Sequence, residues 1–275
     1  MKILETKPNQ ISLSAEKSLR REFHRKLLTP FNKAVKDYRL ISPGDRIAVC
    51  ISGGKDSMLM AKLLEEYALR CGNITLEYIS LDPGYNTENA LAVEENAQKL
   101  NIPLKIYPAE IFGFVNTLKG NPCFMCAKIR RGNLYARAKE LGCSKIALGQ
   151  HYDDIIETIL MSMLYGGQVQ TMMPRVHSAN FPGMEIIRPL YLVREENIIR
   201  WAEANGLSFI KCACRFTAGD DPGTRQRIKT LIADLCRENP QIESNIFRSV
   251  HNVKLSELMS YKDLDGKVHS FLERF

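Results

Sequence analysis

Residues 46–57 read Arg-Ile-Ala-Val-Cys-Ile-Ser-Gly-Gly-Lys-Asp-Ser and join a short apolar stretch to two adjacent glycines. The stretch Arg46–Ile51 predicts a buried β-strand, and the residues Ser57–Tyr67 that follow predict a helix. Adjacent glycines allow the backbone to turn sharply and to bring its N–H groups close to a ligand. A glycine loop between a strand and a helix N-terminus is an anion site, because free amides and the helix dipole both favour negative charge.

The loop itself is therefore the first candidate site, and it comprises Ser52, Gly53, Gly54, Lys55, Asp56 and Ser57. Lys55 supplies a cation suited to phosphate, and Asp56 can orient the loop or reach a Mg²⁺ ion. The Walker A pattern G-x-x-x-x-G-K-[ST] does not fit these residues. An ordinary glycine turn is the simpler alternative, but the order of strand, glycines, lysine, aspartate and helix favours a phosphate-binding loop.

Three further apolar stretches, Thr75–Leu81, Leu104–Tyr107 and Lys145–Leu148, predict strands with helical patterns between them. Such alternation predicts an α/β fold, in which helices cover both faces of a parallel sheet. Ligands of such sheets bind at the carboxyl ends of the strands. This places Asp82 and Gly149, which follow two of the predicted strands, among the candidate binding residues.

The 275 residues suit one sizeable α/β domain with appendages. We expect an N-terminal basic helical extension over residues 1–40, a central domain over 41–223 and a C-terminal helical region over 224–275. No apolar stretch approaches the roughly 20 residues that span a bilayer, and the N-terminus has no secretory signal pattern. We therefore expect a cytoplasmic protein with no membrane partner, whose cysteines are reduced.

The net charge of +7 indicates a polyanionic partner. Basic residues are dense over residues 17–26 and continue to Arg39. Apolar residues recur there at helical spacing, so that one face can dock while the basic face stays in water. By itself the pattern is compatible with a solvated surface helix and with an RNA-backbone contact.

Four of the eight cysteines occur in two pairs, Cys123-Phe-Met-Cys126 and Cys212-Ala-Cys214. Four thiolates suit a structural Zn²⁺ ion, whereas three thiolates with an open position suit an iron–sulfur cluster. The residues alone leave both alternatives open. The single cysteines are predicted to be small buried hydrophobic residues, and they are Cys50, Cys71, Cys143 and Cys236.

An acidic helix start follows the last predicted strand, in the sequence His151-Tyr-Asp-Asp-Ile-Ile-Glu157. Glu157 can share a helix face with Asp153 or Asp154. Carboxylates in a first helical turn also suit the helix dipole, so simple capping is the alternative to a functional role. A lone histidine is often structural, but we favour a site role for His151.

Several separated motifs occur in one order along the chain. They are the Ser52–Ser57 loop, Cys123-x-x-Cys126-Ala-Lys-Ile-Arg-Arg-Gly132, Lys145–Asp154, Leu164-Tyr-Gly-Gly167 and Arg188-Pro-Leu190. Together they resemble the tRNA 2-thiocytidine synthetase group within the PP-loop ATP pyrophosphatase superfamily, from about residue 17 to about residue 255. Members of that superfamily cleave ATP between its α- and β-phosphates and adenylate a substrate.

The resemblance implies a role for each candidate residue. ATP would be bound by the loop together with Asp82 and Gly149, and Mg²⁺ would be supported by Asp153 and Asp154. The implied catalytic residues are Lys55, Asp56, Asp153, Asp154 and Cys214. The implied tRNA-binding residues are Arg130, Arg131 and Arg188.

The resemblance also implies a 4Fe-4S cluster held by Cys123, Cys126 and Cys212, with Zn²⁺ as the alternative metal. Two departures from the group's pattern concern this region. The distal pair is Cys212-Ala-Cys214 where the group usually has C-x-x-C, which leaves open whether Cys212 or Cys214 is the third ligand. Gln150 stands where the group more often has histidine.

The implied activity is an ATP-dependent tRNA sulfurtransferase that replaces the C2 oxygen of a pyrimidine, an anticodon-loop cytidine, with sulfur. Its partners would be tRNA and a separate sulfur donor, either a cysteine desulfurase or inorganic sulfide, and a homodimer is compatible with the sequence. A 2-thiouridine synthetase and a lysidine-type tRNA ligase of the same superfamily are the nearest alternatives. A nucleotide- and zinc-binding regulatory module without turnover is the alternative from another class.

Overall fold

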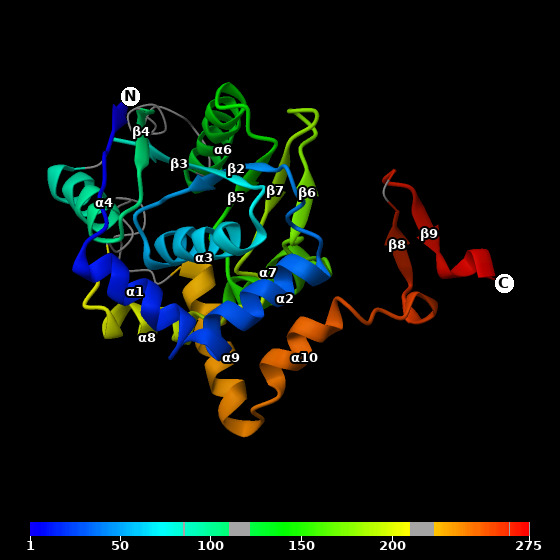
Figure 1. Cartoon of the computed structure of the whole chain (residues 1–275). Coiled ribbons are helices and arrows are strands. Elements are labelled where there is room, and N and C mark those ends of the chain that lie inside the picture. Colours follow the sequence, from blue (N-terminus) through cyan, green and yellow to red (C-terminus); the bar gives the residue numbers. More distant parts are fainter. Residues whose placement is uncertain (85, 110–121, 210–222, 264, 275) are drawn as a thin grey trace. The chain divides into compact units, whose positions relative to one another are not determined.

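The computed structural model describes residues 1–84, 86–109, 122–209, 223–263 and 265–274, without the side chains of 122–128 and 274 (Figure 1). Its main sheet has seven strands in the order β1-β4-β3-β2-β5-β7-β6. In sheet order these strands are β1 (Lys2–Ile3), β4 (Leu104–Pro108), β3 (Thr75–Asp82), β2 (Arg46–Cys50), β5 (Lys145–Ala147), β7 (Glu185–Ile187) and β6 (Arg175–His177). The five inner strands are parallel, and β1 and β6 pair antiparallel at the two edges.

The four strands that the sequence predicts are confirmed, with ends that differ by at most one residue. The strands β1, β6 and β7 were not predicted. Each has only two or three residues, which is too short for the alternation of apolar and polar residues to stand out. β5 is no longer than β6 and β7, but it lies in an apolar stretch that continues to Leu148 and could therefore be predicted. Pairing with β4, β7 and β5, rather than their own sequence, makes β1, β6 and β7 strands.

One face of the sheet is covered by α3 (Lys55–Cys71), which packs on β2 and β3 (Figure 1). Every residue from Ser57 to Leu64 is buried, so α3 is enclosed on all sides over two turns. The enclosure is completed by α1 (Gln10–Arg20) and α8 (Glu195–Ala204), which pack against α3. The helix that follows the glycine loop is thus the central helix of this layer.

The opposite face is covered by α6 (Pro122–Glu140), which packs on β2, β3 and β5 (Figure 1). Ala48 and Cys50 of β2 share a hydrophobic cluster with Tyr135 and Ala138 of α6. Because successive strand residues point to opposite faces of a sheet, Ile47 and Val49 of β2 face α3. Helices on both faces of a parallel sheet confirm the predicted α/β class.

The N-terminal segment is mostly helical, as predicted, although β1 precedes the helices. After α1 come a π-helix, η1 (His24–Leu28), and α2 (Thr29–Asp37). Two further helices of the chain are α4 (Thr87–Lys99) and α7 (Tyr152–Gly166).

The chain forms two compact units, one of residues 1–155 and 173–223 and the other of residues 156–172 and 224–275. The second unit contains α9 (Gly223–Glu238), α10 (Ile242–Ser249), η3 (Leu255–Glu257), β8 (Ser260–Lys262), β9 (Val268–Ser270) and η4 (Phe271–Arg274). The strands β8 and β9 form an antiparallel pair that the prediction of a helical C-terminal region did not include. The predicted division into three parts stays a prediction. In the residues described, no helix combines the length and apolarity needed to cross a membrane.

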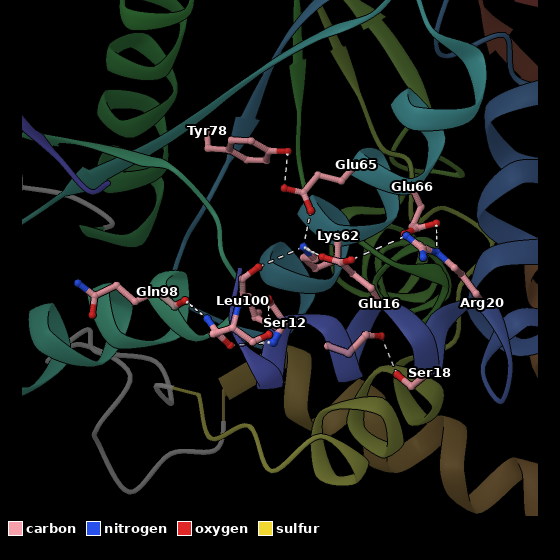
Figure 2. A network of polar contacts seen from close by, with 12 residues as sticks. Ser12, Glu16, Ser18, Arg20, Lys62, Glu65, Glu66, Tyr78, Gln98 and Leu100 are labelled. Carbon is pink, nitrogen blue, oxygen red and sulfur yellow. Dashed lines mark hydrogen bonds and ion pairs between the residues drawn. The ribbon is translucent and has the colours of Figure 1, made fainter. Parts of the chain in front are cut away.

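A buried lysine joins α1 to α3 (Figure 2). Lys62, only 1% exposed, donates to Glu16 of α1 at 2.8 Å and to the carbonyl of Leu100 at 3.1 Å, and it also pairs with Glu65. A buried charge is tolerated only when it is paired and hydrogen-bonded. The two carboxylates and the carbonyl meet that requirement for Lys62.

Replacing Lys62 by alanine is expected to lower the free energy of unfolding by about 3–5 kcal/mol, because Glu16 and Glu65 would keep their charges without the buried cation. Urea unfolding followed by circular dichroism measures the change. Lys99→Ala, which removes a partly exposed lysine from the end of α4, is the matched control and should stay within about 0.5 kcal/mol. A Lys62→Ala variant as stable as this control would show that the network does not stabilise the fold.

Candidate functional site

The glycine loop is closed by two serines at the carboxyl end of β2. The Ser57 hydroxyl donates to the carbonyl of Gly54 at 2.9 Å and accepts from the backbone N–H of Ser52 at 3.1 Å. Gly53 has φ +83°, a conformation that L side chains rarely adopt, so glycine is required there. The loop therefore has a defined shape before any ligand binds.

The helix starts earlier than predicted, at Lys55 rather than Ser57, because Gly54 is its extended N-cap residue. Lys55 and Asp56 therefore stand in the first turn of α3, where backbone N–H groups lack intrahelical partners. This turn brings the lysine charge, the free amides and the positive end of the helix dipole to one place, which suits a phosphate.

Lys55 is neutralised by a residue that the sequence analysis missed. Its Nζ donates to Glu195 at 2.9 Å and lies 3.3 Å from Asp56. Although burial alone would lower the pKa of Lys55, these two carboxylates raise it, so the lysine is a cation. Glu195 is the first residue of α8, and from the sequence its carboxylate could be read only as a partner of that helix's dipole.

His151 is buried among three carboxylates. Its ring nitrogens lie 3.8 Å from Asp56, 3.6 Å from Asp153 and 3.5 Å from Asp154. Burial alone would lower the pKa of His151, but the carboxylates outweigh it and raise the pKa above its ordinary value. This grouping supports the site role that we favoured for His151.

The two neighbouring aspartates of α7 differ in what they contact. Asp153 accepts the backbone N–H of Glu195 at 2.7 Å, whereas Asp154 accepts the backbone N–H of His151 at 3.2 Å. Burial favours a higher pKa for Asp153, but His151 and the Glu195 N–H lower the pKa below its usual range. Asp154 thus provides the helix cap that was the simpler reading, and Asp153 links α7 to the start of α8.

Four buried side-chain atoms without a hydrogen-bond partner lie at the carboxyl ends of three adjacent strands. They follow β2, β5 and β7, and they are Asp56 Oδ1, Gln150 Oε1, His151 Nδ1 and Arg188 Nε. Within the described residues four other such atoms occur elsewhere, in Asn96, Thr171, Asn197 and Trp201. Leaving a buried polar atom unpaired costs about 1–3 kcal/mol. Half of the eight buried atoms without a hydrogen-bond partner in the described residues therefore lie at the edge of the sheet where ligands bind.

Arg188 lies directly after β7, where its Nη1 donates to the carbonyl of Met173. Burial, together with the positive charge of Arg131, lowers the pKa of Arg188. The positive charges of Arg131 and Arg188 repel each other, and an anion bound by both would relieve this repulsion. Arg130, on α6 beside Arg131, is half-buried.

Two candidates at the ends of β3 and β5 have clear structural roles. Asp82 accepts the backbone N–H of Gly84 at 2.9 Å and so forms a turn, while its predicted contact to a nucleoside stays a prediction. Gly149 lies against the first turn of α3, where an added Cβ would stand 3.1 Å from the Ser57 nitrogen.

Glu157 of α7 forms an ion pair with Arg225 at 2.9 Å inside the second unit.

Gly149→Ala is expected to weaken ATP binding on the order of tenfold, because the new methyl group would push the backbone of Asp56 and Ser57 by a few tenths of an ångström. Isothermal titration calorimetry with ATP measures the change. Gly132→Ala is the control, since a Cβ at Gly132 would meet no atom within 4 Å. An unchanged affinity in Gly149→Ala would mean that the loop does not require its present shape.

The cysteine predictions divide into two sets. Cys123 and Cys126 belong to the start of α6 by their backbone, but their side chains, and all of Cys212 and Cys214, lie outside the described residues. Their roles as metal ligands, and that of Cys214 in catalysis, stay predictions. As a donor set, three thiolates fit an iron–sulfur cluster with one open position.

The single cysteines are only partly as predicted. Cys50 and Cys143 are buried, and burial raises the pKa of both thiols, to about 11 for Cys143, so neither is a ready thiolate ligand. The prediction is wrong for Cys71, which is exposed, and Cys236 is half-buried. Cys71 is the last residue of α3, where the helix leaves the core.

Among the side chains that the structure includes, no group of three or more His, Cys, Asp or Glu has the geometry to hold a metal by itself. Mg²⁺ does not need such a cage, because it binds one or two carboxylates together with substrate phosphates and water. The Asp56 Oδ1 atom fits that requirement, because it lies beside the phosphate-binding turn without a hydrogen-bond partner, 3.3 Å from the Lys55 Nζ.

A glycine loop that opens a helix at the carboxyl edge of a parallel sheet defines a nucleotide-binding α/β protein. A family model described as a PP-loop domain matches residues 19–233. The chain belongs to this PP-loop family, and the resemblance that its motifs indicate is confirmed.

Two similar proteins are named tRNA-cytidine(32) 2-sulfurtransferase. The one from Coxiella burnetii (strain RSA 331 / Henzerling II) is 37% identical over 246 residues, which cover 86% of this chain and 93% of that protein. The one from Anaeromyxobacter dehalogenans (strain 2CP-C) is 36% identical over 240 residues, or 86% of this chain and 81% of that protein.

A solved structure of similar fold is the U34-tRNA thiolase NcsA from Methanococcus maripaludis with its [4Fe-4S] cluster. Its TM-score is 0.69 at 24% sequence identity, and the match covers 90% of this chain and 86% of that one. This likeness supports the fold.

Proposed function

We propose that the protein is an ATP-dependent tRNA sulfurtransferase that replaces the C2 oxygen of a cytidine in tRNA with sulfur. The observation that carries the proposal is the set of unpaired buried polar atoms at the carboxyl ends of β2, β5 and β7, beside the glycine loop. Two relatives that are 37% and 36% identical over their aligned residues and carry the name tRNA-cytidine(32) 2-sulfurtransferase support the same reaction.

In the first step the O2 atom of the pyrimidine attacks the α-phosphorus of ATP, and the bond from that phosphorus to pyrophosphate breaks. The first turn of α3 would hold the departing pyrophosphate through its amides, and Lys55 would neutralise the charge that develops. Asp56 would hold Mg²⁺ when it is bound, with Asp153 and Asp154 in support, and the ion would help to neutralise the phosphate charge. Lys55 would have to leave Glu195 to reach the phosphates.

In the second step a sulfur nucleophile attacks C2, the C–S bond forms and AMP leaves with the former carbonyl oxygen. Adenylation is what makes the oxygen a good leaving group. A 4Fe-4S cluster held by Cys123, Cys126 and Cys212 would supply the site for the transferred sulfur. The sulfur itself would come from a separate donor, a cysteine desulfurase or inorganic sulfide. Inorganic sulfide would attack C2 directly and lose its proton, whereas the persulfide sulfur of a cysteine desulfurase would first need two electrons from a thiol reductant.

Arg131 and Arg188 would contact the tRNA substrate. Their guanidinium groups are close enough for one to lower the pKa of the other, and the Arg188 Nε has no partner among the atoms described. Arginine binds phosphate in a two-pronged geometry, which fits this arrangement. Arg130 belongs to the same proposed contact.

The test is mass spectrometry of modified nucleosides in tRNA from cells that lack this protein. We expect 2-thiocytidine to disappear and to return with the wild-type protein but not with Cys123→Ala. Cys71→Ala is the matched control, because Cys71 is an exposed cysteine at the end of α3 and should restore the nucleoside fully.

Each other outcome excludes part of the proposal. Loss of 2-thiouridine in place of 2-thiocytidine would make the protein a thiouridine synthetase and overturn the proposed base. Full restoration by Cys123→Ala would exclude the cysteine centre and favour a ligase-type reaction. Persistence of every thiolated nucleoside in the deletion strain would contradict the sulfurtransferase.

A further inference from the structure

Almost all of the excess positive charge of the chain lies in one segment. Residues 17–39 contain eight lysines and arginines but only two acidic residues, a net charge of +6 out of +7 for the whole chain. The rest of the protein is therefore nearly neutral. Such a concentration is the electrostatic pattern of a surface that binds a polyanion.

The same segment is firmly packed on the first unit. Seven apolar residues of this segment are buried, and they are Leu19, Phe23, Leu27, Leu28, Phe31, Ala34 and Val35. The basic residues between them are exposed. The segment is thus an ordered amphipathic structure that turns its cations to solvent.

Apart from the exposed Glu22, the acidic groups near these cations are already engaged (Figure 2). Glu16 pairs with the buried Lys62, and Arg20 binds Glu66 of α3 at 2.5 Å. Asp37 pairs with Lys33. In the described part of the chain, six exposed cations have no ion pair or side-chain hydrogen bond, and we call them the basic surface: Lys17, Arg21, Arg25, Lys26, Lys36 and Arg39.

The contacts between α1 and α3 also place this surface relative to the glycine loop. Glu66, which holds Arg20, is eleven residues beyond Lys55 on the same helix. At about 1.5 Å per residue this is about 16 Å along the axis of α3. The basic surface therefore begins well away from the reacting phosphates, beside the far half of the helix that the loop opens.

We propose that the basic surface binds the phosphate backbone of the tRNA outside the nucleotide that reacts. This inference rests on the proposed function, because it takes tRNA as the substrate. A base that enters the site belongs to a long, regularly charged molecule, whose flanking phosphates extend well beyond the site. Lysine and arginine at such positions supply affinity without sequence preference.

The test is filter binding of tRNA, without ATP, to the full-length protein with Arg21, Arg25 and Lys26 all replaced by alanine. The control replaces Lys2, Lys7 and Lys99, three basic residues outside the surface, so that both variants lose the same charge. We expect the first variant to bind on the order of 10–100 times more weakly, and the slope of log affinity against log salt concentration to fall by about 2–3. The control should bind like the wild type.

Binding without ATP separates this inference from the sulfur-transfer reaction. If the Arg21/Arg25/Lys26 variant is folded by circular dichroism yet binds like the control, the basic surface is not an RNA contact, and the proposed reaction is untouched. If the salt slope falls as expected while thiolated nucleosides persist in the deletion strain, the surface stands and the reaction is wrong. Failure of the wild type to bind any tRNA would overturn both.

Discussion

Lys55→Ala is expected to lower kcat/KM for ATP in the thiolation reaction about 10³-fold. Lys55 is the cation at the first turn of α3, and Glu195 at 2.9 Å is its present partner. Removal of one preorganised group that stabilises developing charge typically costs 10²–10³ in rate. The loss should lie at the upper end of that range, because Glu195 would then face the phosphates without a compensating charge.

The contribution of Glu195 can be separated with a double mutant. Lys55→Ala combined with Glu195→Gln should regain part of the activity that Lys55→Ala loses, since the repulsion between carboxylate and phosphate is removed. Steady-state kinetics with varied ATP measures both effects, and Lys99→Ala serves as the control for loss of a lysine. If the double mutant is no better than Lys55→Ala, Glu195 does not act on the bound phosphates. A Lys55→Ala protein with near-normal kcat/KM would exclude the loop as the pyrophosphate site.

Asp56→Asn is expected to lower kcat about 10²–10³-fold while making the protein more stable at neutral pH. The activity loss follows from the proposed role of this carboxylate in holding Mg²⁺ against the phosphates, which an amide fulfils poorly. The variant should therefore also need more Mg²⁺ for half-maximal rate. Glu88→Gln, which neutralises an exposed acid at the second position of α4, is the matched control.

The stability gain follows from the pKa of Asp56. Burial raises this pKa above the ordinary aspartate value, although His151 and Lys55 act in the opposite direction. The folded state then binds the proton more tightly than the unfolded state, so the ionised carboxylate destabilises the fold at pH values above the raised pKa. We expect Asp56→Asn to gain about 1 kcal/mol, seen as a rise in Tm of about 2–4 °C.

The gain should also shrink in a definite direction with pH. As the pH falls through the raised pKa, the wild-type carboxyl becomes protonated and regains its stability, so the difference in Tm between wild type and Asp56→Asn should close. Differential scanning fluorimetry across acidic and neutral pH measures this. A difference that grows on acidification would mean that the folded pKa is lowered instead.

Much of the fold could be read from local sequence patterns. The four predicted strands alternate with helices, and the glycine pair after β2 marks the phosphate loop. Both could be read locally, because the pattern of apolar residues and the backbone freedom of glycine are properties of neighbouring residues. The short strands β1, β6 and β7 escaped prediction, since two or three residues carry no period. They are strands because neighbouring strands of the sheet supply their hydrogen bonds.

The candidate site divides in the same way. The sequence by itself determined the phosphate loop, the acidic start of α7 and the paired cysteines, because each of these is a set of residues close together in the chain. Only the tertiary structure decided that Glu195 neutralises Lys55 from 140 residues away. It also decided that Asp56, His151 and Arg188 follow the carboxyl ends of three adjacent strands, β2, β5 and β7. The order of strands in a sheet depends on how distant segments pack, and residue spacing along the chain does not contain it.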